Sequence, residues 1–164
     1  MSLSLEQKSL YLILFDRTQI ARSVAKTLDE GKLREFKIAV FQKVNNLTER
    51  MDKGELSEED IVDSIDSLCS QFGVSFGQSQ KPINVMLKYH FYLTRRWDAR
   101  SKTVLHCPID SGVFDRLGEK GMSLASLDKN KYLELQKEIA EKGQTGLDFD
   151  RAYDAQNLQF WGIL

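Results

Sequence analysis

Apolar residues along most of this chain recur at steps of three and four positions, the spacing of one face of an α-helix. The pattern is clear in residues 33–51, where Phe36, Val40, Val44 and Leu47 form one stripe. No pair of segments shows the alternation and turn residues of a β-hairpin. We therefore expect about seven or eight helices: one capped by Ser4, then residues 18–30, 33–51 and 57–73, one beginning at Lys81, then 110–119, 128–142 and 149–160.

Glycine and proline indicate where these helices begin and end. Gly31 is expected to break one helix, and Gly73 to end another in a left-handed conformation. Pro82 suits the first turn of a helix, because its missing N–H has no helical partner there. The pattern predicts a hairpin loop over residues 73–80 and a polar connection over residues 98–104.

Composition fits one all-α domain spanning residues 1–164. The chain has 41% apolar residues, enough for a core, and a net charge of −1, so overall charge does not attract polyanions. The charge is unevenly distributed: the charged residues within 81–102 are mostly basic, and those within 52–66 are mostly acidic. These segments are either local binding surfaces or two solvated helix faces.

Cysteine usage and hydropathy bear on the compartment. Cys69 and Cys107 form no CxxC motif or disulfide framework, which favours a reducing compartment. The longest apolar run, residues 10–15, is too short to span a membrane, and residues 1–4 show no signal peptide. We expect a cytoplasmic protein without membrane association, cofactor or metal. His106 and Cys107 are expected to be a buried pair with satisfied polar groups, or else to line a cleft beside Asp110.

Lys81 and Asp110 carry the candidate chemistry. Lys81 follows a glycine-bearing turn and Asp110 begins a later helix, so two helix starts can meet in one cleft. A neutral amine in such a cleft can act as a nucleophile beside a carboxylate. The residues alone leave open a solvated lysine at a helix start and an aspartate that only caps a helix.

Two short segments around these residues match motifs of a known family. Residues 80–84 read Gln-Lys-Pro-Ile-Asn and residues 109–113 read Ile-Asp-Ser-Gly-Val. Together they resemble the helix-hairpin-helix DNA glycosylases, the endonuclease III superfamily. The separation of Lys81 from Asp110 is similar to that of the archaeal 8-oxoguanine glycosylase branch. The resemblance covers residues 77–117.

The resemblance implies a base-excision glycosylase and abasic-site lyase. Lys81 would attack the anomeric carbon of an extruded nucleotide, and the resulting Schiff base would lead to strand cleavage. Asp110 would stabilise the developing positive charge or accept the lysine proton. The residues expected to contact DNA, through backbone N–H groups at a helix start or through cationic side chains, are Gly77, Gln78, Ser79, Gln80, Lys88, Arg95, Arg96 and Arg100.

Two other functions fit the same sequence. One is a helical module that binds DNA or RNA without catalysing a reaction. The other is a protein-interaction domain that uses its acidic segment, residues 52–66, or its apolar helix faces. Near the end of the chain, Phe160 and Trp161 are expected to dock into the core.

Overall fold

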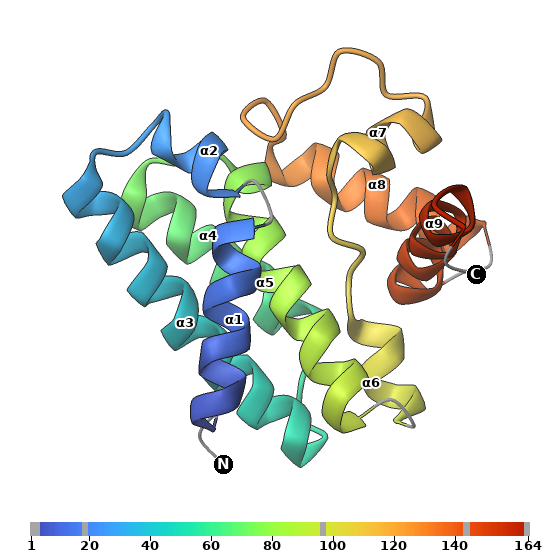
Figure 1. Ribbon diagram of the computed structural model, residues 1–164, viewed down its shortest axis with the longest axis horizontal. Coiled ribbons are helices and arrows are strands. Elements are labelled where there is room, and N and C mark those ends of the chain that lie inside the picture. Colours follow the sequence, from blue (N-terminus) through green and yellow to red (C-terminus); the bar gives the residue numbers. More distant parts are fainter. Residues whose placement is uncertain (1–3, 18–19, 96–97, 143–144, 163–164) are drawn as a thin grey trace.

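The computed structural model describes residues 4–17, 20–95, 98–142 and 145–162 (Figure 1). Within these residues the chain forms nine α-helices and one π-helical turn and no strand, which confirms the all-α fold class. The elements are α1 (Leu5–Arg17), α2 (Ile20–Ala25), α3 (Glu30–Lys53), α4 (Glu58–Phe72), α5 (Phe76–His90), η1 (Phe91–Arg95), α6 (Ala99–Val104), α7 (Ser111–Leu117), α8 (Lys129–Glu141) and α9 (Gly146–Phe160).

Several expected helix ends are confirmed by capping contacts. The Ser4 hydroxyl accepts the N–H of Gln7 (3.2 Å) in the first turn of α1. Ser57 and Asp60 form a reciprocal capping box at the start of α4. The same helix ends at Gly73, whose φ of 67° lies in the left-handed region that glycine adopts at low cost.

Two expected breaks are wrong, and side-chain caps explain both. Asp29 accepts the N–H of Lys32 (2.9 Å), so α3 begins at Glu30 and Gly31 lies inside the helix. Asp98 caps α6 in the same way, and residues 99–104 are therefore helical rather than a polar connection. In both places a short-range cap outweighs a weak break signal.

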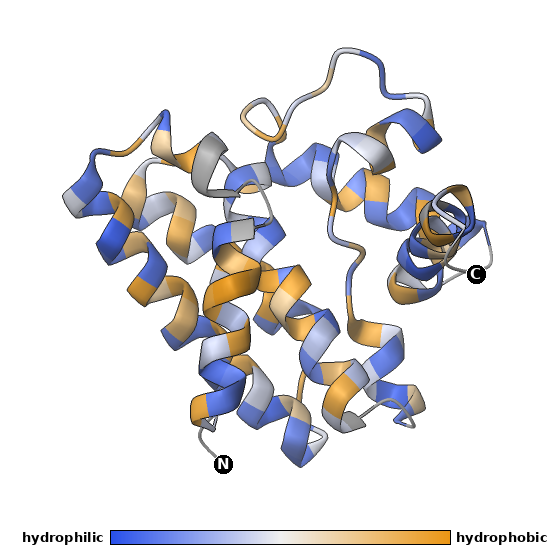
Figure 2. Cartoon of the chain, viewed as in Figure 1, coloured by the Kyte–Doolittle hydropathy of each residue, from blue (hydrophilic) through white to orange (hydrophobic). Residues whose placement is uncertain are grey.

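Helix α5 is the central element of the fold. It packs against α1, α2, α3 and α4 on one side and against α8 on the other. Figure 1 shows α1–α4 gathered on the left of α5 and α6–α9 on its right. Hydrophobic residues run in bands along the helices (Figure 2), and nearly every residue of α5 is buried. Lys81 and Tyr89 are the α5 residues that are only partly buried, and both line one cavity together with residues of α1, α7 and α9.

The end of α9 departs from the expected packing. Phe160 and Trp161 are 80% and 73% exposed, so their expected docking into the core is wrong. The two rings stack edge to face on each other, with centroids 5.3 Å apart. In the part of the chain that the structure describes, no helix has both the length and the apolar composition that a membrane span requires.

Candidate active site

The segment that precedes Lys81 is helical, so the expected hairpin loop is wrong. Ser75 caps α5: its hydroxyl accepts the N–H of Gln78 (3.1 Å), and the Gln78 side chain accepts the N–H of Ser75 (2.9 Å). Only residues 73–75 connect α4 to α5. Lys81 therefore lies in the second turn of α5, and Pro82 lies inside the helix rather than in its first turn.

The four residues assigned to phosphate binding by the hairpin are buried in α5 instead. They are Gly77, Gln78, Ser79 and Gln80. The N–H of Gly77 donates to the Leu127 carbonyl (2.9 Å), and the N–H of Ser79 donates to the Ser75 carbonyl (3.1 Å). Because these donors are already paired within the protein, they are not the free N–H groups at a helix start that we expected to contact DNA.

Gly77 has a packing role in place of the expected turn role. A Cβ atom at this position would lie 2.3 Å from the Leu124 carbonyl oxygen, a contact that backbone atoms do not tolerate. Glycine thus allows the first turn of α5 to approach the segment before α8. This close approach sets the position of the helix that carries Lys81.

Asp110 divides its two carboxylate oxygens between two partners. Its Oδ1 accepts the N–H groups of Gly112 (3.0 Å) and Val113 (3.2 Å), which caps α7 as expected. Its Oδ2 accepts a hydrogen bond from the Lys81 ammonium, with Nζ at 3.2 Å. The expected meeting of the two side chains is confirmed, and the cap and the ion pair coexist in one carboxylate.

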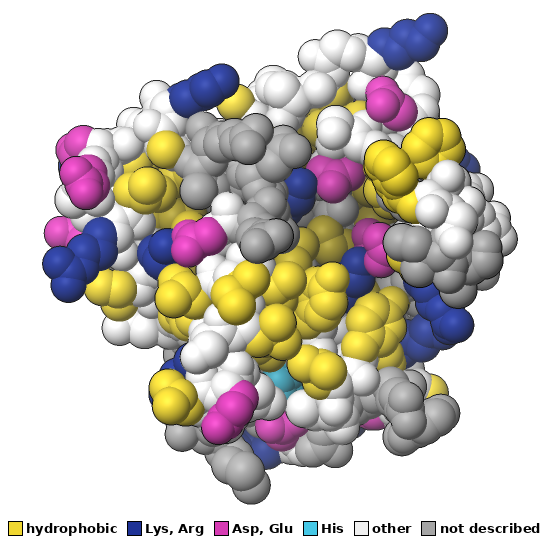
Figure 3. Space-filling model, in the orientation of Figure 1, with side chains coloured by type: hydrophobic (Ala, Val, Ile, Leu, Met, Phe, Trp, Pro, Cys, Tyr) yellow, Lys and Arg dark blue, Asp and Glu magenta, His cyan; other side chains and the backbone are white. Residues whose placement is uncertain are grey.

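Two adjoining cavities share this ion pair. The central cavity has a volume of about 370 Å³ and the lateral cavity, toward α2 and residues 122–125, about 490 Å³; Lys81, Asp110 and Ser111 line both. The side chains of Lys81 and Asp110 are 12% and 32% exposed. A ligand in either cavity can therefore touch the amine and the carboxylate. Figure 3 shows basic and acidic atoms close together where this face is hollowed.

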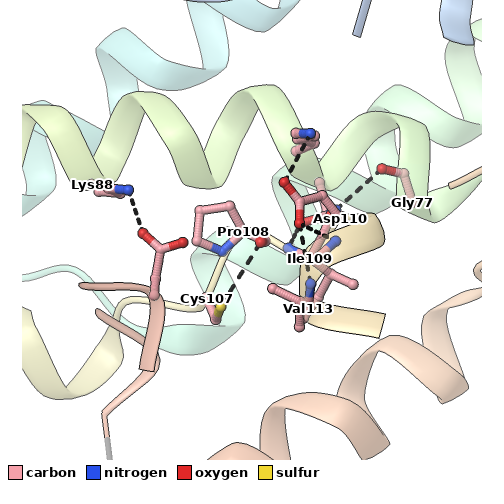
Figure 4. A network of polar contacts seen from close by, with 11 residues as sticks. Gly77, Lys88, Cys107, Pro108, Ile109, Asp110 and Val113 are labelled. Atoms are coloured by element: carbon pink, nitrogen blue, oxygen red, sulfur yellow. Dashed lines mark hydrogen bonds and ion pairs between the residues drawn. The ribbon is translucent and has the colours of Figure 1, made fainter. Parts of the chain in front are cut away.

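Lys88 occupies the other end of the central cavity. It forms ion pairs with Asp150 and with Asp154 (2.8 Å), both from α9, and its side chain is only 9% exposed. Burial disfavours the charged amine, but the two carboxylates outweigh burial and raise the pKa of Lys88. Figure 4 shows Pro108 between Lys88 and Asp110. The two carboxylates of α9 thus favour the charged form of Lys88 and enclose it.

The central cavity has no excess of positive charge. Its lining contains the two lysines and three carboxylates, those of Asp110, Asp150 and Asp154, together with the Tyr153 hydroxyl. Burial is the main influence on Asp150 and raises its pKa, while Lys88 opposes that rise. A ligand of this cavity meets both donors and acceptors rather than a uniformly cationic wall.

The other expected DNA contacts have different outcomes. Lys88 is not on a solvated face, because it is buried against α9, so its assignment to a surface phosphate contact is wrong. The side chain of Arg95 and all of Arg96 lie outside the described residues. Arg100 is exposed in the first turn of α6 and remains free to meet an anion.

Three cavity residues escaped the sequence analysis. Asp150, Tyr153 and Asp154 all lie on α9 and face the central cavity. The predicted helix over residues 149–160 contained them without a motif. The usable signal was the four-residue spacing of the two aspartates, which places both carboxylates on one helix face. Only the tertiary fold indicates that this face meets Lys88.

His106 and Cys107 form the buried pair with satisfied polar groups that we expected. His106 Nδ1 lies 2.6 Å from the Tyr132 hydroxyl, and its Nε2 lies 2.9 Å from Glu58. Burial raises the pKa of the Cys107 thiol well above its usual range, so it is not a ready nucleophile. Among the described residues, no group of three or more His, Cys, Asp or Glu side chains is arranged to hold a metal ion.

Comparison of the chain with protein-family models, with curated proteins and with solved structures found no match. The resemblance to the DNA glycosylases therefore depends on the short motifs around Lys81 and Asp110. What the structure adds is the contact between those two residues.

Proposed function

We propose that this chain is a DNA base-excision glycosylase and abasic-site lyase, with Lys81 as the nucleophile and Asp110 as its proton acceptor. The observation that carries the proposal is the 3.2 Å contact between the two groups at the wall shared by two cavities. Cavities of this size lie within the range of about 300–1,000 Å³ that is typical of small-ligand sites.

The geometry gives each group a definite step. Asp110 Oδ2 accepts a proton from the Lys81 ammonium and leaves a neutral amine. On an intact nucleotide this amine attacks C1′, the C1′–N bond to the base breaks, and the departing base takes the proton held by Asp110. The sugar ring then opens, with a proton passing from the lysine nitrogen to O4′, and leaves a protonated Schiff base. On an abasic site the amine adds to the C1′ aldehyde, and loss of water gives the same protonated Schiff base. Removal of a C2′ proton then expels the 3′-phosphate and cuts the strand.

Two features support DNA as the substrate. The first is the resemblance of residues 80–84 and 109–113 to the glycosylase motifs. The second is the exposed cation Arg100, which can contact a phosphate outside the cavity. The central cavity has one more carboxylate than lysine in its lining, which favours an electrically neutral group, such as an extruded sugar and base, over a phosphate inside it.

Borohydride trapping tests the proposal. The protein is incubated with an oligonucleotide that contains one abasic site, and borohydride reduces any Schiff base to a stable covalent bond. We expect a covalent complex with the wild type and none with Lys81→Met. Lys137→Met is the matched control, because this lysine is 78% exposed on α8, and its complex should form normally.

A second arm replaces the DNA with free 2-deoxyribose 5-phosphate. Trapping of the free sugar but not of the oligonucleotide overturns the assignment to DNA and leaves the reactive amine. Salt-sensitive DNA binding without any trapping overturns the enzyme and leaves a non-catalytic nucleic-acid-binding module. Lack of both binding and trapping contradicts the proposal altogether.

A further inference from the structure

The extended segment before α7, residues 105–110, brings Asp110 to Lys81. It is buried almost throughout and lies in no helix or strand. Buried backbone N–H and C=O groups require hydrogen-bond partners. Here the partners at two alternate residues are glutamine side chains rather than a neighbouring strand.

Two glutamines bind this segment in the same way. Gln80 Nε2 donates to the Ile109 carbonyl (2.7 Å), and the Ile109 N–H donates to Gln80 Oε1 (3.2 Å). Gln136 Nε2 donates to the Cys107 carbonyl (2.7 Å), and the Cys107 N–H donates to Gln136 Oε1 (3.1 Å). A side-chain amide offers one donor and one acceptor side by side, as a β-strand backbone does.

Gln80 differs from Gln136 in its distance from the ion pair. Gln80 and Lys81 are consecutive on α5, and they contact the consecutive residues Ile109 and Asp110. Asn84, one turn further along α5, donates to Gln80 Oε1 (3.0 Å) and holds the amide in place. Gln136 makes its contacts from α8, two residues earlier in the segment.

We propose that Gln80 is the positioning residue of the Lys81–Asp110 pair, and that Gln136 supports the same segment without setting that contact. Gln80 fixes the backbone immediately before Asp110, and Lys81 extends from the adjacent residue of the same helix. The consequence for catalysis rests on the proposed function, whereas the effect on the ion pair does not.

The matched variants are Gln80→Met and Gln136→Met. Both keep the side-chain volume similar and leave one buried N–H and one buried C=O unpaired, so both should lower the midpoint of thermal unfolding. Displacing a catalytic group by about 1 Å can cost about 10²-fold in rate. We expect the trapping rate to fall at least about tenfold further in Gln80→Met than in Gln136→Met, at equal folded fractions.

Gln80→Glu adds a readout that general destabilisation does not give. A protonated carboxyl group has an O–H donor and a C=O acceptor, so it can replace the amide at Ile109. The ionised form can still accept the Ile109 N–H, but it places an acceptor oxygen against the Ile109 carbonyl, where a donor is needed. The trapping rate of Gln80→Glu, relative to that of the wild type, should therefore recover as the pH is lowered. A constant ratio overturns the positioning role.

The ion pair is also tested without DNA. An amine-reactive reagent is applied to each folded variant, and the modification rate of Lys81 is measured by peptide mass spectrometry with the exposed Lys137 as the internal reference. We expect Lys81 to be modified several-fold faster in Gln80→Met than in the wild type, and unchanged in Gln136→Met.

Together, DNA trapping and Lys81 modification distinguish failure of the proposed function from failure of the positioning role. If the wild type forms no DNA complex but Lys81 modification rises only in Gln80→Met, the proposed function fails and the positioning role stands. If both glutamine variants leave Lys81 modification unchanged, or both raise it equally, Gln80 has no special role, whatever the trapping result.

Discussion

The two ends of the central cavity place lysines of the same helix in different surroundings. Lys81 and Lys88 are seven residues apart on α5, so they point in nearly the same direction. Lys88 meets two carboxylates from α9 and is almost fully enclosed. Lys81 meets one carboxylate, which also caps α7, and lies between two cavities.

Lys88 therefore has a structural role, whereas the Lys81 amine is available to a ligand. The two partners of Lys88 raise its pKa and favour the charged amine, and their ion pairs tie α9 to α5. Among the described residues the ion-pair partner of Lys81 is Asp110, and a ligand can approach this pair from either cavity. Helix geometry makes the two lysines equivalent, and the elements packed around them make them different.

Removing Lys88 should have the largest effect on stability. Lys88→Met leaves Asp150 buried without its cation, and breaking a buried ion pair typically costs about 3–5 kcal/mol. Lys81→Met should cost clearly less, because Asp110 keeps its helix-capping contacts. Urea denaturation of both variants measures the difference. Equal losses of unfolding free energy in the two variants would show that the two ends of the central cavity do not differ in this way.

The dependence of stability on alkaline pH should also reveal the structural role of Lys88. The pKa of Lys88 is higher in the folded than in the unfolded chain, so above the ordinary lysine pKa of about 10.4 the unfolded chain releases its proton first. The folded state then holds more protons, and the free energy of unfolding falls as the pH rises. Burial also raises the pKa of Tyr11 and Tyr132, which adds to the fall.

Lys88→Met provides the control for that pH dependence. Its free energy of unfolding should fall less steeply than that of the wild type above the lysine pKa, because the Lys88 contribution is lost while those of other groups with raised pKa values, such as Tyr11, Tyr132 and Cys107, remain. Denaturation midpoints measured at several alkaline pH values give the two slopes. Identical slopes would show that Lys88 does not retain its proton in the folded state.

Gly77→Ala should displace the start of α5, which carries both lysines. The added Cβ would meet the Leu124 carbonyl, and overpacking of this kind costs about 1–3 kcal/mol. Gly31→Ala in α3 is the control, because its Cβ has ordinary contacts and alanine favours a helix by up to about 1 kcal/mol. Thermal unfolding should shift in opposite directions. A shift in the same direction would refute the packing role of Gly77.

Substitutions of Asp110 should have the smallest effect on stability, and they separate its helix-capping role from its role as proton acceptor. Asp110→Asn keeps a good N-cap, whereas Asp110→Ala loses the cap at a cost of about 1 kcal/mol. Both remove the proton acceptor of Lys81, so both should abolish borohydride trapping. Full trapping by Asp110→Asn would mean that the carboxylate serves only the helix.

The sequence predicted much of the fold because helix periods and caps are local. Ser57, Gly73 and Asp110 mark real helix ends, since each acts through contacts within a few residues. The start of α5 was misplaced because Pro82 and the nearby glycine suggested a turn. The Ser75–Gln78 capping box was the local signal that places the start correctly.

The site was only partly predictable for a different reason. Lys81 and Asp110 could be paired from their motifs, and the contact between their side chains bears out that meeting. The aspartates of α9 and the glutamine contacts to Ile109 and Cys107 depend on segments far apart in sequence. The exposure of Phe160 could not be predicted either, because an apolar side chain does not by itself indicate whether another element covers it.

The most direct test of the central claim identifies which lysine carries the trapped sugar. After borohydride reduction with abasic-site DNA, the protein is digested and the modified peptide is sequenced by mass spectrometry. We expect modification at Lys81 and none at Lys88, because two carboxylates enclose Lys88 and favour its charged form. Modification at Lys88, or spread over exposed lysines with Lys81 unmodified, would contradict it.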